Sequence, residues 1–242
     1  MDENKESTVN VSGFYDEFSK KQLSTGINLR HYYLFDQLVK AGLKKDSSVL
    51  EIGCGIGTLT QLMANYLKRG EIHATDISPE SISVARKRLA DFKRISLEVS
   101  DMNGFNAGRT YDFIILADVI EHIPFSEHTE LFRTISLHAH PGSVVFLNIP
   151  HPKATEYFER TDPSKLQIID QAVYAGALIA PAEACGLVLS SYRSYSLFQK
   201  QSDYVLVIFG VNRDISFSPV SRIRIILRKL WLRLSYLERI MF

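Results

Sequence analysis

The sequence predicts an α/β fold, in which a mostly parallel sheet of seven strands carries helices on both faces. Between Ser47 and Val211, short runs of β-branched and aliphatic residues alternate with longer amphipathic stretches. This alternation is typical of parallel strands joined by helices. The last two apolar runs, Leu187–Ser196 and Tyr204–Val211, are separated only by a polar loop, so they should form a closing antiparallel pair.

The other elements follow from the same patterns. From Ser12 to Gly42, aromatic and aliphatic residues recur at helical spacing, which predicts two helical pieces. Five strands are expected after them, at Ser48–Ile52, Glu71–Thr75, Arg94–Val99, Asp112–Ala117 and Ser143–Asn148. Helices are expected at Gly57–Lys68, Pro79–Asp91 and Ser126–His138, with a further, largely helical connection at Thr161–Gly186.

Composition excludes several classes of protein. The chain has 242 residues, of which 45% are hydrophobic, and its 28 basic residues nearly balance 27 acidic ones. These values exclude a disordered chain and a uniformly basic nucleic-acid binder. Two cysteines, Cys54 and Cys185, cannot form a disulfide framework. Because the first residues are polar and acidic and no long uncharged apolar run follows, we expect a cytoplasmic protein.

A glycine-rich turn and two acidic positions follow three successive strands. The turn, Gly53-Cys54-Gly55-Ile56-Gly57, comes directly after the first strand, where glycine lets the backbone approach a ligand closely. Asp76 ends the second strand, and its carboxylate can accept both hydroxyls of a ribose. Asp101-Met102 follows the third strand and offers an acceptor and an apolar surface to an adenine. Each signal is weak alone, but together they predict a nucleoside site.

As a set, Glu51 to Gly57, Asp76, Asp101-Met102 and Tyr111 to Asp118 resemble the ordered motifs of the class I S-adenosylmethionine-dependent methyltransferases. The resemblance covers roughly Val49 to Phe209. It implies a Rossmann-like sheet whose last strand is antiparallel, with S-adenosylmethionine as cofactor and S-adenosylhomocysteine as product.

The resemblance also implies roles for individual residues. Around the methionine moiety these are the turn residues Gly53, Cys54 and Gly55, together with Glu51, which should fix the amino group, and the segment Ala117-Asp118. Around the adenosine they are Asp76 for the ribose and Ile77, Asp101 and Met102 for the base.

The segment after the fourth strand carries the candidate catalytic groups. Glu121 and His122 follow Asp118 closely, and His151 follows the fifth strand. His122 would act as a general base oriented by an acid, with Glu121 and His151 beside it. The segment resembles the corresponding region of quinone-biosynthesis O-methyltransferases and small-RNA 2′-O-methyltransferases, some of which bind a divalent metal there. A metal site at Asp118, Glu121 and His122 is therefore the alternative, although we favour a reaction without metal.

Residues 1–46 are expected to form a helical lid over the cofactor, ahead of a cofactor-binding core at 47–213. Tyr15 is the lid residue expected to contact the cofactor, and Tyr32 and Tyr33 are further candidates beside Arg30 and His31. Packing is the alternative role of these aromatic residues. Amides and acids in Gln167–Gln171 would suit a hydroxylated acceptor such as a sugar.

The last segment, 214–242, is basic. From Ile215 onward six cations oppose the single acid Glu238, so the rest of the chain is acidic overall. An apolar stripe recurs there at steps of three and four, comprising Ile223, Ile226, Leu227, Leu230, Leu234, Leu237 and Met241. Such a helix fits the surface of an anionic membrane, which would place the protein peripherally on its inner face and suit a lipid-linked acceptor. Packing on the domain or in a homodimer is the alternative.

These features together predict transfer of a methyl group from S-adenosylmethionine to a small-molecule hydroxyl, on a saccharide, a glycolipid or a lipid-linked precursor. The alternatives are an RNA 2′-O-methyltransferase, an N-methyltransferase of a small amine, and a scaffold that binds the cofactor without catalysis. The acidic body disfavours a nucleic-acid partner, because phosphate contacts need cations.

Overall fold

A computed structural model describes residues 26–163, 170–212 and 218–241. Tyr15 therefore lies outside the described residues. The chain divides into two compact units, Met1–Asn212 and Arg213–Phe242, and each is described by itself.

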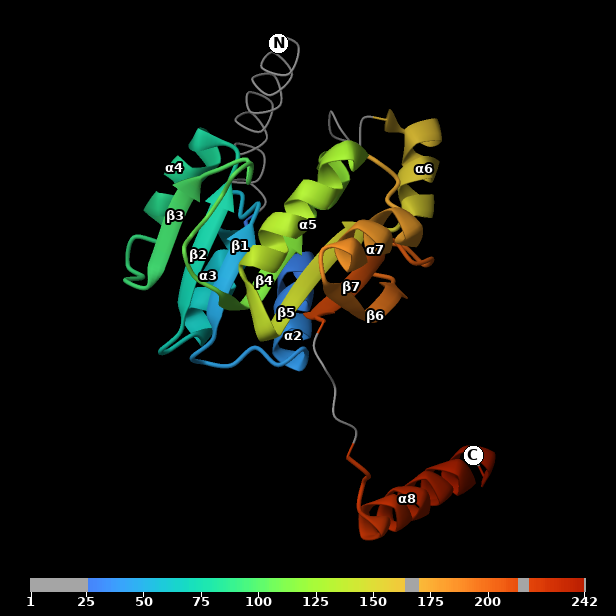
Figure 1. Cartoon of the computed structure of the whole chain (residues 1–242). Helices are drawn as coiled ribbons and strands as arrows, with labels where there is room; N and C mark the ends of the chain where they lie inside the picture. Colours follow the sequence, from blue (N-terminus) through green and yellow to red (C-terminus); the bar gives the residue numbers. More distant parts are fainter. Residues whose placement is uncertain (1–25, 164–169, 213–217, 242) are drawn as a thin grey trace. The chain divides into compact units, whose positions relative to one another are not determined.

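The first unit is built on a seven-stranded sheet with the order β3-β2-β1-β4-β5-β7-β6 (Figure 1). Its strands are β1 (Ser48–Ile52), β2 (Glu71–Asp76), β3 (Ile95–Val99), β4 (Tyr111–Ala117), β5 (Ala139–Pro150), β6 (Leu187–Tyr195) and β7 (Tyr204–Val211). Strands β1 to β5 pair in parallel, and β7 pairs antiparallel with both β5 and β6. The predicted seven-stranded, mostly parallel sheet with an antiparallel last strand is confirmed.

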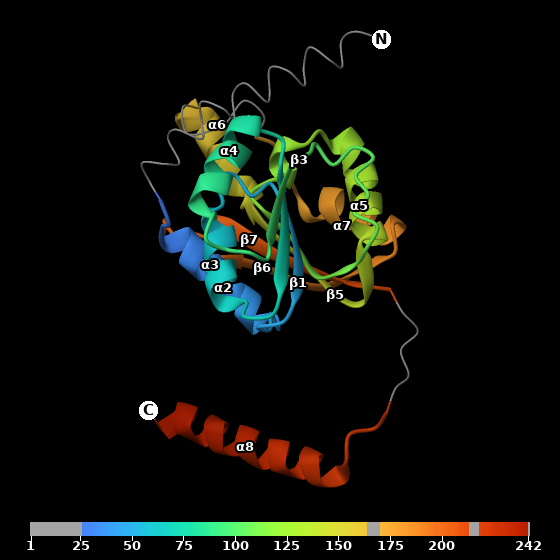
Figure 2. The same ribbon diagram turned by 90° about the vertical axis from the view of Figure 1, so that its left-hand side faces the viewer.

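Helices cover both faces of this sheet (Figure 2). The described helices are α2 (Leu29–Lys40), α3 (Thr58–Tyr66), α4 (Pro79–Arg88), α5 (His128–Leu137), α6 (Pro152–Thr161) and α7 (Ala175–Ala184), with short 3₁₀ turns at Ile120–His122 and Phe125–Glu127. Helix α2 packs on α3, and α5 packs on α7, so the sheet is buried between two helical layers.

Strand β4 shows why the sheet sits at the centre. Its side chains alternate between faces, as the pleat of a strand requires. Ile114 and Leu116 join the core beneath α5 and α7, while Phe113 and Ile115 join the core beneath α2 and α3. Because both faces of β4 are buried after Asp112, the strand is apolar from Phe113 to Ala117.

Two connections differ from the sequence prediction. Helix α6 begins at Pro152, with His151 as its N-cap, in a stretch where no helix is expected from the sequence. The signal is present, because proline favours the first position of a helix. Strand β5 begins at Ala139 rather than Ser143, and a register shift between Tyr111 and Phe113 of β4 accommodates Pro141-Gly142 within the pairing.

The second unit is helix α8 (Arg222–Met241). Its described apolar side chains, Ile223, Ile226, Leu227, Leu230 and Leu234 among them, are exposed, as are its cations as far as Arg233. No helix among the described residues is both long and apolar enough to cross a bilayer.

Candidate functional site

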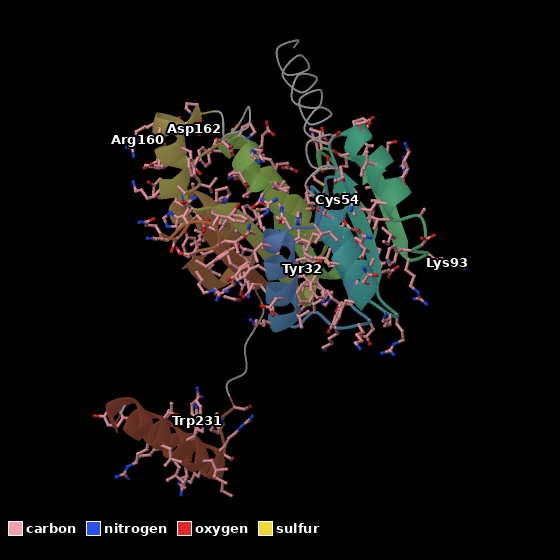
Figure 3. All side chains as sticks on the ribbon, turned by 180° about the vertical axis from the view of Figure 1, so that it is seen from behind. Tyr32, Cys54, Lys93, Arg160, Asp162 and Trp231 are labelled. Atoms are coloured by element: carbon pink, nitrogen blue, oxygen red, sulfur yellow. The ribbon has the colours of Figure 1, made fainter. Side chains whose placement is uncertain are left out.

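A pocket opens at the carboxyl ends of β1, β2 and β4, the edge at which open α/β sheets bind ligands. The predicted cofactor-binding residues within the described range all line it, namely Glu51, Gly53, Cys54, Gly55, Asp76, Ile77, Asp101, Met102, Ala117 and Asp118. His122 lines it as well. Figure 3 labels Cys54 in the turn at this edge. The chain therefore gathers ten residues from four strand ends around one cavity.

The glycine turn between β1 and α3 forms one wall of the pocket. Gly53 and Gly55 have φ angles of 73° and 54°, a region that glycine adopts without steric cost. The N–H groups of Gly53 and Cys54 both donate to the Thr75 carbonyl oxygen, at 2.8 and 2.9 Å, which ties the turn to β2. A Cβ atom on Gly53 would lie 2.3 Å from Val119 Cγ2, so this position also needs glycine for close packing.

Asp76 connects the turn to the end of β2. Its Oδ2 accepts a hydrogen bond from the Gly55 N–H at 2.7 Å, and its Oδ1 accepts one from the Ser78 N–H at 2.9 Å. Two backbone donors thus fix the plane of a buried carboxylate.

Glu51 is buried at the base of the pocket. Its Oε2 accepts a hydrogen bond from Thr60 Oγ1 at 2.6 Å. Burial raises the pKa of Glu51 to about 8, and although the Thr60 hydroxyl lowers it, the nearby Asp76 raises it further. Burial likewise raises the pKa of the Cys54 thiol, so this thiol is neutral. Without a ligand, Glu51 is therefore largely protonated near neutral pH.

Met102 and Asp101 form the wall expected to face the base. Met102 has a φ angle of 65°, uncommon for a residue with a side chain, and its N–H donates to Ser100 Oγ at 3.0 Å. The Thr75 hydroxyl lies 3.5 Å from the Met102 sulfur. Asp101 is exposed, and its Oδ1 accepts a hydrogen bond from the Asn103 N–H at 2.9 Å. The buried thioether of Met102 beside the exposed carboxylate of Asp101 suits an adenine ring that enters the pocket by one edge.

Asp118 is the centre of a polar network at the end of β4. Its φ angle is 56°, and this left-handed conformation turns the chain away from the sheet. Arg30 of α2 forms an ion pair with its Oδ2, and Asn148 Nδ2 donates to its Oδ1 at 2.7 Å. The hydroxyl of Tyr195 in turn donates to Asn148 Oδ1 at 2.6 Å. The network therefore joins α2 to β4, β5 and β6 at the rim of the pocket.

The candidate base, His122, lies between two carboxyl groups. Its Nδ1 is 3.4 Å from Asp170 Oδ1, and its Nε2 is 3.9 Å from Glu121 Oε1. Glu121 is only 1% exposed, and neither of its carboxyl oxygens has a hydrogen-bond partner. Burial and the neighbouring Asp118 raise the pKa of Glu121 well above its ordinary value. The raised pKa favours the neutral form of Glu121, and the Asp170 carboxyl lies nearer to the His122 ring than the Glu121 carboxyl does.

His31 also lines the pocket, but both of its ring nitrogens are engaged. Its Nδ1 accepts a hydrogen bond from the Asn28 N–H at 3.1 Å, so Nε2 carries the proton and donates to Thr58 Oγ1 at 2.9 Å. Burial, with the charges of Arg30 and Arg88, lowers the pKa of His31 to about 4. His31 therefore fastens α2 to α3 as a neutral side chain.

The remaining predicted residues lie elsewhere. His151 is absent from the pocket lining and caps α6, where its Nδ1 accepts a hydrogen bond from the Lys153 N–H at 3.2 Å. Glu121 lies behind His122, and Tyr33 stacks on Tyr195 with ring centroids 4.4 Å apart. Only Asp170 and Gln171 of the segment proposed to face the acceptor are described, and Asp170 does lie beside His122.

Comparison with known proteins assigns the family. A model of the methyltransferase domain family matches residues 50–145, which contain the glycine turn, Asp76, Asp101 and Asp118. This match, together with the relatives and structures below, supports a class I S-adenosylmethionine-dependent methyltransferase. The pocket at the carboxyl ends of β1, β2 and β4 lies in the part of the chain that this family model matches, apart from its lining residues Arg30, His31 and Leu34.

Curated relatives support the same family. Malonyl-[acyl-carrier protein] O-methyltransferase of Priestia megaterium is 30% identical over 132 residues, which are 54% of this chain and 46% of that protein. Nodulation protein S of Sinorhizobium fredii is 28% identical over 41% of this chain and 46% of its own length. The chain thus spans less than half the length of these relatives.

Solved structures share the fold at low identity. N-methyltransferase NodS from Bradyrhizobium japonicum superposes with a TM-score of 0.59 at 18% identity, covering 76% of this chain and 95% of that one. Magnesium protoporphyrin IX methyltransferase from Synechocystis gives a TM-score of 0.66 at 16% identity, covering 85% and 99%.

Proposed function

We propose that the protein transfers the methyl group of S-adenosylmethionine to a hydroxyl of a small-molecule acceptor. The observation that carries this proposal is the position of His122, in the wall of the cofactor pocket with Asp170 on its Nδ1 side. An imidazole oriented by a carboxylate is suited to remove the proton of a hydroxyl, which is a poor nucleophile until it loses that proton.

The proposed step follows from this arrangement. The acceptor oxygen gives its proton to His122 and attacks the methyl carbon, while the carbon–sulfur bond breaks and the sulfonium becomes a neutral thioether. The methyl group is already activated, so the protein contributes in-line placement of the two reactants and the base. His31 is unsuited to this role, because both of its ring nitrogens hold other groups.

The names of the relatives support a small acceptor and differ in the atom that is methylated. They include an O-methyltransferase of malonyl-[acyl-carrier protein], a trans-aconitate 2-methyltransferase and an N-methyltransferase. Within this range we favour a hydroxyl, on a saccharide, a glycolipid or a lipid-linked precursor, because a hydroxyl must lose its proton to attack and His122 beside Asp170 is placed to take it.

Calorimetry with S-adenosylmethionine and S-adenosylhomocysteine tests the cofactor site, and transfer of labelled methyl groups to panels of alcohols, sugars, amines and carboxylates tests the acceptor. We expect labelled ethers from the alcohol panel. His122→Ala should lower turnover by about 100-fold or more while cofactor affinity stays within about threefold. Undiminished activity of this variant, or labelling confined to amines, would contradict the proposal.

The residues of the alternative metal site fit a cation poorly. Asp118 is bonded to Arg30 and Asn148, and burial raises the pKa of Glu121, which disfavours the charged form that a cation would need. Among the described residues, no group of three or more His, Cys, Asp or Glu side chains could hold a metal ion. We expect the rate of methyl transfer to persist in excess EDTA, and its loss, restored by Mg²⁺ or Mn²⁺, would reverse this assignment.

We also infer that α8 binds an anionic membrane. Its exposed apolar side chains include Ile223, Leu230 and Trp231, and its cations flank them. This combination favours the interface of a bilayer, where the apolar side is buried and the arginines meet lipid phosphates. Cosedimentation with anionic vesicles should detect binding, and Leu230→Glu should abolish it. Equal binding of native protein and variant would exclude this role for α8.

A further inference from the structure

Exposed cations gather in the loops that precede β1, β2, β3 and β4. They are Lys44, Lys45, Lys68, Arg69, Lys93, Arg94 and Arg109. Because these strands are parallel, all four loops lie at the amino edge of the sheet, opposite the cofactor pocket. We call this set of seven residues the basic edge.

Backbone contacts make the basic edge continuous. The N–H groups of Lys68 and Arg69 both donate to the Lys45 carbonyl oxygen at 2.9 Å, which joins the first two loops. Arg94 Nη1 donates to the Arg69 carbonyl oxygen at 2.8 Å, which adds the third loop. A cavity of about 290 Å³ lies between Lys93, Arg94 and Arg109. The cations therefore form one surface rather than four separate spots.

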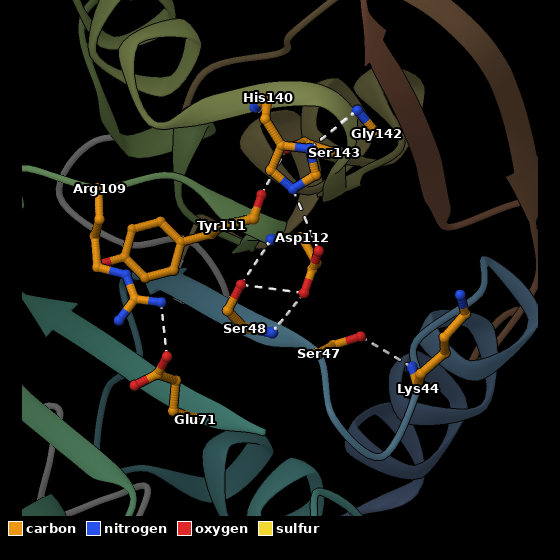
Figure 4. Close-up of polar contacts among 10 residues, drawn as sticks. All are labelled: Lys44, Ser47, Ser48, Glu71, Arg109, Tyr111, Asp112, His140, Gly142 and Ser143. Carbon is orange, nitrogen blue, oxygen red and sulfur yellow. Dashed lines mark hydrogen bonds and ion pairs between the residues drawn. The ribbon is translucent and has the colours of Figure 1, made fainter. Parts of the chain in front are cut away.

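Three of the neighbouring acids, Glu71, Asp46 and Asp112, have partners inside this edge, as Figure 4 shows in part, while the exposed Asp91 lies in the loop before β3. Arg109 Nη2 lies 2.6 Å from Glu71 Oε1, and Arg69 Nη2 lies 3.3 Å from Asp46 Oδ2, so each acid forms an ion pair. Asp112 accepts hydrogen bonds from the Ser48 N–H at 2.8 Å and from His140 at 3.2 Å.

Four lysines of the basic edge have no carboxylate partner among the described residues, namely Lys44, Lys45, Lys68 and Lys93, of which Lys45 lies over the Tyr66 ring. The surplus charge of this edge is therefore positive and points into solvent. The opposite edge holds the pocket acids Asp76, Asp101 and Asp118, so charge is separated along the direction of the strands. The net charge of the residues before Ile215 is negative, and this total hides the separation of charge between the two edges.

The chain leaves the first unit at the same edge. Strand β7 runs antiparallel, so its last residues pair with the beginning of β5, where Gly210 lies opposite Val144. The Asn212 N–H then donates to the Gly186 carbonyl oxygen at 2.8 Å. A short linker follows and leads to α8, with its exposed apolar residues and cations.

We propose that the basic edge is a docking surface for an anionic lipid bilayer, which lipid phosphates hold against Lys44, Lys68 and Lys93. Positive charge alone would suit nucleic acid equally well. The bilayer is favoured because the chain that leaves this edge continues to α8, whose exposed isoleucine, leucine and tryptophan side chains suit an apolar phase, so this choice rests on the membrane role proposed for α8. The surface itself is independent of the methyl acceptor and of the role assigned to His122.

Docking in this way places the pocket on the side of the domain that faces away from the lipid. Strand β1 has five residues, so its two ends are about 17 Å apart at ~3.3 Å per residue. A hydroxyl at the bilayer surface is then out of reach of His122. The acceptor class that fits a docked enzyme is a soluble molecule, or a head group long enough to extend past the domain.

The test compares two full-length variants with the same change in charge. The edge variant carries Lys44→Gln, Lys68→Gln and Lys93→Gln. The control variant carries Lys153→Gln, Arg160→Gln and Lys200→Gln, which remove three exposed cations near the carboxyl edge. Figure 3 labels Lys93 and Arg160 at well-separated places on this unit. Binding is measured with vesicles of phosphatidylcholine containing one third phosphatidylglycerol, and S-adenosylhomocysteine calorimetry verifies that both variants are folded.

Each lysine near an anionic surface contributes about fivefold in affinity, so the edge variant should bind these vesicles about 100-fold more weakly. The control variant should stay within about threefold of the native protein. Equal losses in both variants, or none in either, would overturn the proposal. Binding of single-stranded RNA that depends on the edge lysines, without edge-dependent vesicle binding, would assign the surface to nucleic acid instead. Leu230→Glu separates the two elements, because it removes α8 binding and leaves the edge intact.

Discussion

Protonation of Glu51 makes cofactor binding depend on pH. Burial raises the pKa of this carboxyl to about 8, so the unliganded protein holds it mostly as the neutral acid below that pH. If Glu51 binds the amino group of the methionine moiety, the incoming cation favours the carboxylate and drives off the proton. Binding should therefore release a proton and become tighter as the pH rises toward 8.

The size of the effect follows from the pKa. One pH unit below it, about nine tenths of Glu51 is protonated, and each further unit lowers the affinity about tenfold, or about 1.4 kcal/mol. Between about pH 7 and about pH 6 the amino group of the ligand stays charged, because its ordinary pKa is about 8. Affinity for S-adenosylhomocysteine should therefore fall about tenfold across this window.

Calorimetry in buffers with different ionisation enthalpies measures both the affinity and the proton release, which should approach about one proton near pH 7. Glu51→Gln is the control, because glutamine resembles the neutral acid and its carbonyl can still accept the Thr60 hydrogen bond. The variant should bind like the native protein near pH 6 and more weakly near pH 8. A native affinity that is constant over the window, or the same slope in Glu51→Gln, would refute the reasoning.

Three further predictions concern stability, measured by denaturant unfolding. Gly53→Ala should cost about 3 kcal/mol, from the left-handed backbone and the contact with Val119. Gly104→Ala, with a φ angle of 67° and open space around it, should cost only about 1 kcal/mol, and equal costs would remove the argument from packing. Arg30→Ala should cost about 2 kcal/mol, because it removes the cation that pairs with Asp118, whose side chain is only 12% exposed. Lys40→Ala is the control, because Lys40 pairs with Asp36 and their side chains are 65% and 52% exposed; it should cost at most about 0.5 kcal/mol. A similar loss of stability in Arg30→Ala and Lys40→Ala would contradict burial as the cause. Since the pKa of Glu51 is raised on folding, its contribution to stability is present at low pH and lost as the pH rises from about 4.5 through about 8, so Glu51→Gln should gain stability relative to the native protein over that range. A stability difference that is flat with pH would contradict the neutral state of Glu51.

The cofactor half of the site was predictable because it depends on local sequence. Parallel strands bring their carboxyl ends to one edge, so any residue that follows a strand is placed once the strand is recognised. Gly53, Asp76 and Met102 were found in this way, and the structure places all three in the pocket wall. Strand β4 was equally visible, since burial on both faces makes it apolar from Phe113 to Ala117.

The acceptor half was less predictable because it depends on contacts between distant segments. Nothing in the neighbourhood of Arg30 indicates that it pairs with Asp118, 88 positions later. The buried state of Glu121 was likewise hidden, since Glu-His before a proline reads as a polar loop. His151 had a local signal that pointed elsewhere, because the proline after it marks the start of α6.

The antiparallel direction of β7 has a practical consequence for handling the protein. Since this strand ends at the edge opposite the pocket, the chain continues from the domain on the side remote from the cofactor entrance. An affinity tag, a dye or a solid support joined directly after Asn212, in place of the second unit, is therefore anchored at the edge opposite the pocket. Immobilised in this way, the protein should present its pocket to solution, and candidate acceptors can be passed over it while the entrance stays open.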